Sequence, residues 1–91
     1  MKREDVYKLI DSERDYMDIL TKGATTPGGR PYIVEEWLYY IDYYLRQAKN
    51  IPPITPRPIA TTQAMAIIRK LAGICVCAME KIDTPAREPH E

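Results

Sequence analysis

Apolar side chains recur at steps of three and four residues in three stretches of the chain, which is the spacing of one face of an α-helix. The first stretch covers about Arg3 to Leu20, and the second covers about Ile33 to Lys49. The third is expected to begin at a cap formed by Thr61 or Thr62 and to run to about Ile82. The sequence therefore predicts an all-α fold with three main helices.

Two connecting segments differ in composition from these stretches. Residues 22–32 are rich in Gly, Thr and Pro, which is typical of a loop. Residues 50–60 contain four prolines and are expected to be extended rather than helical, because proline removes an N–H donor and fixes φ. Residues 83–91 are expected to be flexible. The prediction is a single domain over residues 1–91, built as a compact bundle with Gly/Thr-rich and Pro-rich connecting loops.

The third predicted helix is apolar around nearly its whole circumference. Its apolar residues are Met65, Ile67, Ile68, Leu71, Ala72, Ile74, Cys75, Val76, Ala78 and Met79. Such a helix has to be buried on several sides. Two short partner helices can hardly cover it, so we expect the protein to form a homo-oligomer.

Composition limits the possible partners. The 91 residues include thirteen basic and thirteen acidic side chains, and this balance argues against a nucleic-acid polymer or an anionic membrane as the partner. The strongly apolar stretch Leu71–Met79 is too short to span a bilayer. The first residues contain charges and no apolar signal core, which favours a cytoplasmic protein.

The charges are unevenly distributed along the chain. Residues 1–42 contain nine acidic and six basic residues, whereas residues 43–79 contain five basic residues and no acidic one. This half of the chain could be mostly core and proline loop, where carboxylates are not expected. It could instead present an electropositive surface that binds an anion such as a phosphate.

The loop from Lys22 to Arg30 has the features of an anion site. Its glycines let backbone N–H groups approach a ligand, Thr25 and Thr26 add hydroxyl donors, and the two end residues are cationic. The Gly-Lys-Ser/Thr ending of a Walker motif is missing. A plain solvent loop is the alternative interpretation.

Two cations interrupt the third helix, and several tyrosines occur on the other two. Arg69 and Lys70 need water, a ligand, or an acid of the first helix such as Asp15 or Asp18. Tyrosines could stack on a base, although such stripes also occur in cores and subunit interfaces. The candidate ligand-binding residues are Arg14, Tyr16, Lys22, Thr25, Thr26, Arg30, Tyr40, Arg69 and Lys70.

No catalytic residue, cofactor or metal ligand is predicted. The single histidine is the penultimate residue, His90, which disfavours a histidine-based triad. Cys75 and Cys77 point about 200° apart on a helix, and both are expected to be reduced core thiols. Glu35 and Glu36 open the second helix, where they complement its dipole, or they belong to a metal site that would need further acids facing them.

Three short runs resemble a group of short phage proteins. These runs are Glu13-Arg14-Asp15-Tyr16, Glu35-Glu36-Trp37-Leu38, and Ile68–Ala72 continuing through Cys77–Glu80. That group is similar to the all-α nucleotide pyrophosphohydrolases of the MazG-like type. The resemblance implies magnesium held by Glu-x-x-Glu on one helix and Glu-x-x-Asp on the next.

This sequence departs from that acid pattern. Glu36 matches the first position, but Tyr39 occupies its partner position, and Arg69 and Lys70 lie where the second pair of acids is expected. The resemblance therefore implies binding of a nucleotide-type anion without hydrolysis. In a phage, such a protein would act in the host cytoplasm as a sponge for a host nucleotide immune signal. The alternatives are a divergent magnesium-dependent nucleoside triphosphate pyrophosphohydrolase and a protein–protein interaction module that uses the tyrosines of the second helix.

Overall fold

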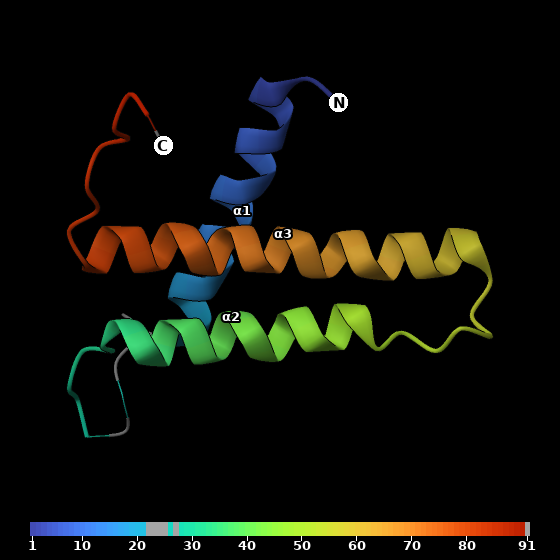
Figure 1. Cartoon of the computed structure of the whole chain (residues 1–91), viewed down its shortest axis with the longest axis horizontal. Helices are drawn as coiled ribbons and strands as arrows, with labels where there is room; N and C mark the ends of the chain where they lie inside the picture. Colours follow the sequence, from blue (N-terminus) through green and yellow to red (C-terminus); the bar gives the residue numbers. More distant parts are fainter. Residues whose placement is uncertain (22–25, 27, 91) are drawn as a thin grey trace.

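The computed structural model describes residues 1–21, 26 and 28–90. It contains three helices, α1 (Arg3–Thr21), α2 (Val34–Lys49) and α3 (Arg57–Lys81), and no strand within the described residues (Figure 1). The predicted all-α class is confirmed, and the arrangement is consistent with a small helical bundle. From the sequence, Gly23 is well placed to cap the C-terminus of the first helix, but it lies outside the described residues.

Helix α3 is the centre of the molecule. It lies antiparallel to α2, and α1 crosses both of them steeply on one side (Figure 1). The backbone of α3 packs against α1 and against α2, whereas no such backbone contact joins α1 to α2 in the described residues. The N-terminal half of α1 projects beyond α3, which leaves Val6, Tyr7 and Leu9 exposed.

Local interactions determine where α2 begins. The Glu36 carboxylate accepts a hydrogen bond from the backbone N–H of Ile33 at 3.0 Å, and this satisfies a donor that the helix itself cannot pair. Glu35 and Glu36 lie in the first turn, and Arg46 and Lys49 lie in the last. Both charge placements complement the helix dipole.

Helix α3 begins earlier than the sequence predicts. Its first residue is Arg57, so the expected cap at Thr61 or Thr62 is wrong. Pro58 lies in the first turn, where its missing N–H would have no helical partner anyway and its fixed φ suits the helix. The hydroxyl of Thr62 instead donates to the Pro58 carbonyl inside the helix, at 3.0 Å. The proline-rich segment therefore prevents helix formation only as far as Pro56.

The core is small. Its buried apolar residues are Trp37, Ile74 and Cys77, and two charged residues, Glu13 and Arg14, are buried beside them. The expectation that α3 is buried on several sides does not hold within one chain, because many of its apolar side chains are exposed. Both cysteines are free, but Cys75 is exposed and is therefore not a core thiol as expected.

The dimensions of the chain match this thin core. The radius of gyration is 15.1 Å, whereas a compact domain of this length has about 12 Å. The accessible surface is 7454 Å², against about 5,400 Å² for a compact monomer of this mass. Residues 83–90, the exposed loops and uncovered helix faces all contribute to this difference.

Helix α3 also meets the length and composition of a membrane-spanning helix. It has 25 residues, and only 17% of its most apolar window is buried within the chain. The core helix of a soluble protein can pass the same test. The sequence argument about the short stretch Leu71–Met79 therefore does not apply to the helix as a whole.

Candidate functional site

A glycine brings α1 close to α3. Gly73 is buried, and a Cβ atom added there would lie 2.8 Å from Cγ of Glu13 and 3.1 Å from Sδ of Met17. Both distances are shorter than ordinary van der Waals contact, so only glycine allows this approach. The close contact brings the charged side chains of the two helices together.

Each arginine between α1 and α3 is paired with a carboxylate. Nε of Arg69 donates to Glu13 Oε1 at 3.3 Å, and Arg14 donates to both Glu80 and Asp18. The hydrogen bonds that Arg14 donates to Glu80 and Asp18 raise its pKa above the ordinary value for arginine, although burial of the side chain, which is only 8% exposed, acts in the opposite direction. The acid predicted for Arg69 was Asp15 or Asp18, and the structure shows Glu13 instead.

The described part of the 22–30 loop forms its own contacts. Thr26 Oγ1 accepts the backbone N–H of Arg30 at 3.1 Å, and the Arg30 guanidinium donates to both oxygens of Glu36 at 2.9 and 3.1 Å. The hydrogen bond from Arg30 lowers the pKa of Glu36 below its usual value. The candidates Lys22 and Thr25 lie outside the described residues.

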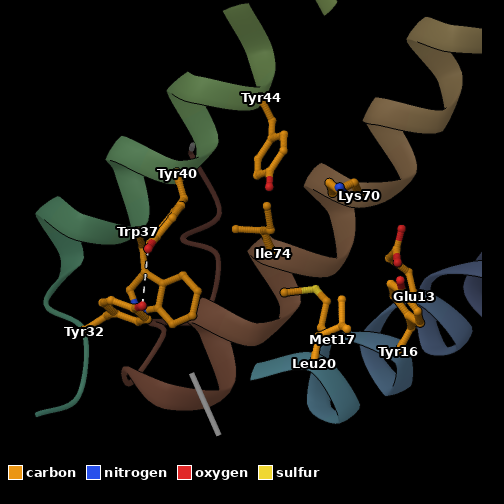
Figure 2. A pocket seen from close by; sticks show the side chains of 10 residues that line it. All are labelled: Glu13, Tyr16, Met17, Leu20, Tyr32, Trp37, Tyr40, Tyr44, Lys70 and Ile74. Atoms are coloured by element: carbon orange, nitrogen blue, oxygen red, sulfur yellow. Dashed lines mark hydrogen bonds between the residues drawn. The ribbon is translucent and has the colours of Figure 1, made fainter. Parts of the chain in front are cut away.

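A cavity of about 260 Å³ lies where side chains of all three helices meet (Figure 2). Aromatic side chains form much of its wall, and an acid and a base line it as well. The lining residues are Glu13, Tyr16, Met17, Leu20, Tyr32, Trp37, Tyr40, Tyr44, Lys70 and Ile74. Figure 2 shows the side chains from α1 facing those from α2 and α3 across this space. We refer to it as the aromatic cavity.

The aromatic rings on the α2 side support one another edge to face. Tyr32 lies 5.3 Å from Trp37 and 5.5 Å from Tyr40 between ring centroids, at interplanar angles of 72° and 76°. The hydroxyls of Tyr32 and Tyr40 share a hydrogen bond of 3.3 Å, which raises the pKa of Tyr32 above its ordinary value. These contacts fix the orientation of the rings.

The lining residues Lys70 and Trp37 differ in how open their polar groups are to a ligand. Nζ of Lys70 lies 4.7 Å from the ring centroid of Tyr44, and no carboxylate pairs with it among the described residues. Nε1 of Trp37 is buried without accessible surface and has no hydrogen-bond partner in the described part of the chain. A buried N–H without an acceptor costs about 1–3 kcal/mol, and a ligand in the cavity does not reach this one in the structure as it stands.

The structure brings together three of the nine candidate residues. Tyr16, Tyr40 and Lys70 line the aromatic cavity, whereas Arg14, Arg30 and Arg69 do not line it and are each paired with an acid. Sequence reasoning missed Glu13, Tyr32, Trp37 and Tyr44 as site residues. Trp37 and Tyr44 belong to the apolar stripe of the second helix, and Tyr32 lies just before that helix. Only the folded structure, in which they converge with Tyr16 and Lys70, identifies them as site residues.

Two of the three acids of α2 are paired with arginines. Glu36 is bound to Arg30, and Asp42 is bound to Arg46 at 2.8 Å. Over residues 1–21, 26 and 28–90, no three His, Cys, Asp or Glu side chains gather closely enough to hold a metal ion.

Comparisons of this chain with known protein families, with curated proteins and with solved structures gave no match.

Proposed function

We propose that this protein binds a nucleotide-type anion without hydrolysing it, with the base in the aromatic cavity and a phosphate at Lys70. The observation that carries the proposal is the convergence of five aromatic side chains and one unpaired cation on a single cavity. Stacking of a base on an aromatic side chain is worth about 1–3 kcal/mol and tolerates any base, because every base has a π-face.

The size of the cavity limits what enters it. Ligand pockets in proteins usually measure about 300–1,000 Å³, and this cavity measures about 260 Å³. It therefore suits one ring system, with the sugar and phosphates outside. Lys70 lies at the cavity with its ammonium over Tyr44, and a phosphate oxygen can approach that ammonium without displacing a carboxylate.

The ring edge of a base would have a partner as well. The carboxylate of Glu13, which lines the cavity, can accept a hydrogen bond from an amino group of the base. Glu13 is buried, at 7% exposure, which strengthens such a bond relative to one made in water. A binder of this kind in a host cell would act as a sponge that removes a nucleotide signal, as the resemblance to phage proteins suggests.

The test begins with identification of the ligand. Mass spectrometry of small molecules released from the purified, denatured protein should detect a nucleotide, and calorimetry then measures its affinity. Tyr16→Ala should weaken binding about 5- to 150-fold through loss of stacking. The matched control is Tyr7→Ala, because Tyr7 is a tyrosine on the same helix with similar exposure, 58% against 54%, and lies outside the cavity.

A second pair of variants tests the phosphate contact. Lys70→Gln should weaken binding about 10- to 150-fold, the loss of one charge-assisted hydrogen bond. Lys81→Gln changes the same charge on the same helix away from the cavity and should leave the affinity unchanged. Equal affinities for all four variants would refute this site. Release of phosphate or pyrophosphate from the bound nucleotide in the presence of magnesium would refute binding without hydrolysis.

A further inference from the structure

We propose that α3 is also the interface between two copies of this chain, which meet along its uncovered face in antiparallel orientation. The face consists of apolar and small residues spaced alternately by three and four positions. They are Met65, Ile68, Ala72, Cys75 and Met79, and we call them the outer seam. This spacing is that of the contact positions of a coiled coil, and it keeps one side of a helix against a partner helix.

The outer seam points away from both neighbours of α3 within the chain. Residues Arg69, Gly73 and Glu80 contact α1, and Lys70 contacts α2. At 100° per residue, the centre of the outer seam lies roughly 100° around the helix from the α1 contacts and roughly 180° from Lys70. Met65, Ile68 and Met79 are accordingly 55%, 48% and 57% exposed.

The protein exposes more surface than a compact monomer does. Its accessible surface of 7454 Å² exceeds that of a compact monomer of this mass by about 2,000 Å², and the exposed side chains of the outer seam contribute to this excess together with residues 83–90 and the projecting half of α1. A standard interface covers about 800 Å² on each partner, and obligate homodimers cover more. The thin core of Trp37, Ile74 and Cys77 is consistent with a chain whose remaining apolar contacts come from a second copy.

A second copy fits this face because the outer seam is self-complementary. No charged residue belongs to it, so two seams meet without an unpaired charge. When two antiparallel copies are centred on Ala72, the small Ala72 side chains meet at the centre and the long methionine side chains meet at the two ends. Ile68 of one copy then lies opposite Cys75 of the other, and Met65 lies opposite Met79. The small side chain of Ala72 allows the two helices to approach each other at the centre.

Sedimentation and light scattering at micromolar concentration should show a dimer or a larger even-numbered assembly. Ile68→Glu places a charge in the centre of the contact and should weaken association at least about 30-fold. Gln63→Glu is the matched control, since Gln63 is an exposed residue on the opposite side of the same helix, and it should associate as the wild type does. Circular dichroism checks that both variants remain helical. A soluble wild-type monomer, or wild-type protein that partitions into lipid vesicles instead of associating, overturns the proposal.

Disulfide formation tests the register through a covalent bond that is gained and not through association that is lost. In a Cys77→Ser background, Ile68→Cys should form disulfides with Cys75 of the second copy under oxidised glutathione, and it should give a covalent dimer. Gln63→Cys in the same background should remain monomeric on a denaturing gel. An oligomer in which Ile68→Cys forms no covalent dimer overturns the antiparallel contact centred on Ala72.

Discussion

Helix α3 makes two contacts within the chain, and they use different chemistry. Against α1, the contact consists of a glycine and of charged pairs, with Glu13 bound to Arg69 and Arg14 bound to Glu80. Against α2, it consists of apolar and aromatic packing around Trp37 and Ile74, and the cation Lys70 lies over the ring of Tyr44.

The difference shows which cations can serve a ligand. An arginine that already holds a carboxylate must give it up before it binds a phosphate, and a carboxylate left buried would cost more than the new bond gains. The attraction of Lys70 to the ring of Tyr44 is worth about 0.5–2 kcal/mol and leaves its ammonium hydrogens free for an anion. The abundance of basic residues in the second half of the chain therefore does not itself make an anion site.

The largest loss of stability is expected at the aromatic contact between α2 and α3. Trp37→Ala removes the largest buried side chain of the core and should lower the free energy of unfolding by about 3–5 kcal/mol. Chemical denaturation followed by circular dichroism measures this loss. The control is Tyr39→Ala on the same helix, because Tyr39 is 69% exposed and contributes little to the core.

Equal losses for Trp37→Ala and Tyr39→Ala would show that the α2 contact does not hold the fold. Because a domain of this size has a total stability of only about 5–10 kcal/mol, Trp37→Ala is expected to be partly unfolded at room temperature.

A smaller loss of stability is expected at the charged contact between α1 and α3, and its size depends on how buried the arginine is. Arg14→Ala removes a side chain that is only 8% exposed and leaves Glu80 and Asp18 without their cation, so it should cost about 1.5–3 kcal/mol. Arg46→Ala removes a comparable ion pair, with Asp42, in which the arginine side chain is 72% exposed, and it should cost less than about 1 kcal/mol. Denaturation midpoints of the two variants measure the difference. If Arg14→Ala cost no more than Arg46→Ala, the buried pairs would not hold α1 against α3.

Much of the fold could be predicted from the sequence, because helical periodicity is a local property. The three helices occur where the apolar spacing places them, and α1 and α2 begin and end within a residue or so of the predicted bounds. The start of α3 differs from the prediction, because all four prolines of residues 50–60 are expected to exclude helix and Pro58 does not. Pro58 is compatible with a first helical turn, whereas Pro52 and Pro53 lie in the turned segment before it.

The site was less predictable, because it depends on how the helices are rotated and crossed. The candidates Tyr16, Tyr40 and Lys70 line one cavity only because α1 crosses α3 at Gly73. The partner of Arg69 depends on the same crossing. Asp15 and Asp18 lie on the same helix as Glu13, but it is Glu13 that accepts the hydrogen bond from Arg69. A helical wheel gives the faces of each helix and does not give the angle between two helices.

The smallest effect concerns the two tyrosines that share a hydrogen bond in the aromatic cavity. The pKa of Tyr32 is raised mainly by its hydrogen bond with Tyr40, so the folded protein holds this proton to higher pH than the unfolded chain does. The stability from this bond is fully present below the ordinary tyrosine pKa of about 10 and is lost as the pH rises through the higher pKa of the folded state. Tyr40→Phe should bring the pKa of Tyr32 back toward its ordinary value and remove this part of the alkaline loss of stability.

Titration of the tyrosinate absorbance measures the pKa of Tyr32, and thermal melts below and above that pKa measure the stability. Tyr7→Phe is the control, because Tyr7 is exposed on α1 and away from the cavity. If Tyr40→Phe and Tyr7→Phe changed the titration equally, Tyr32 and Tyr40 would not share a proton-dependent contact, and the α2 wall of the aromatic cavity would be held by ring packing alone.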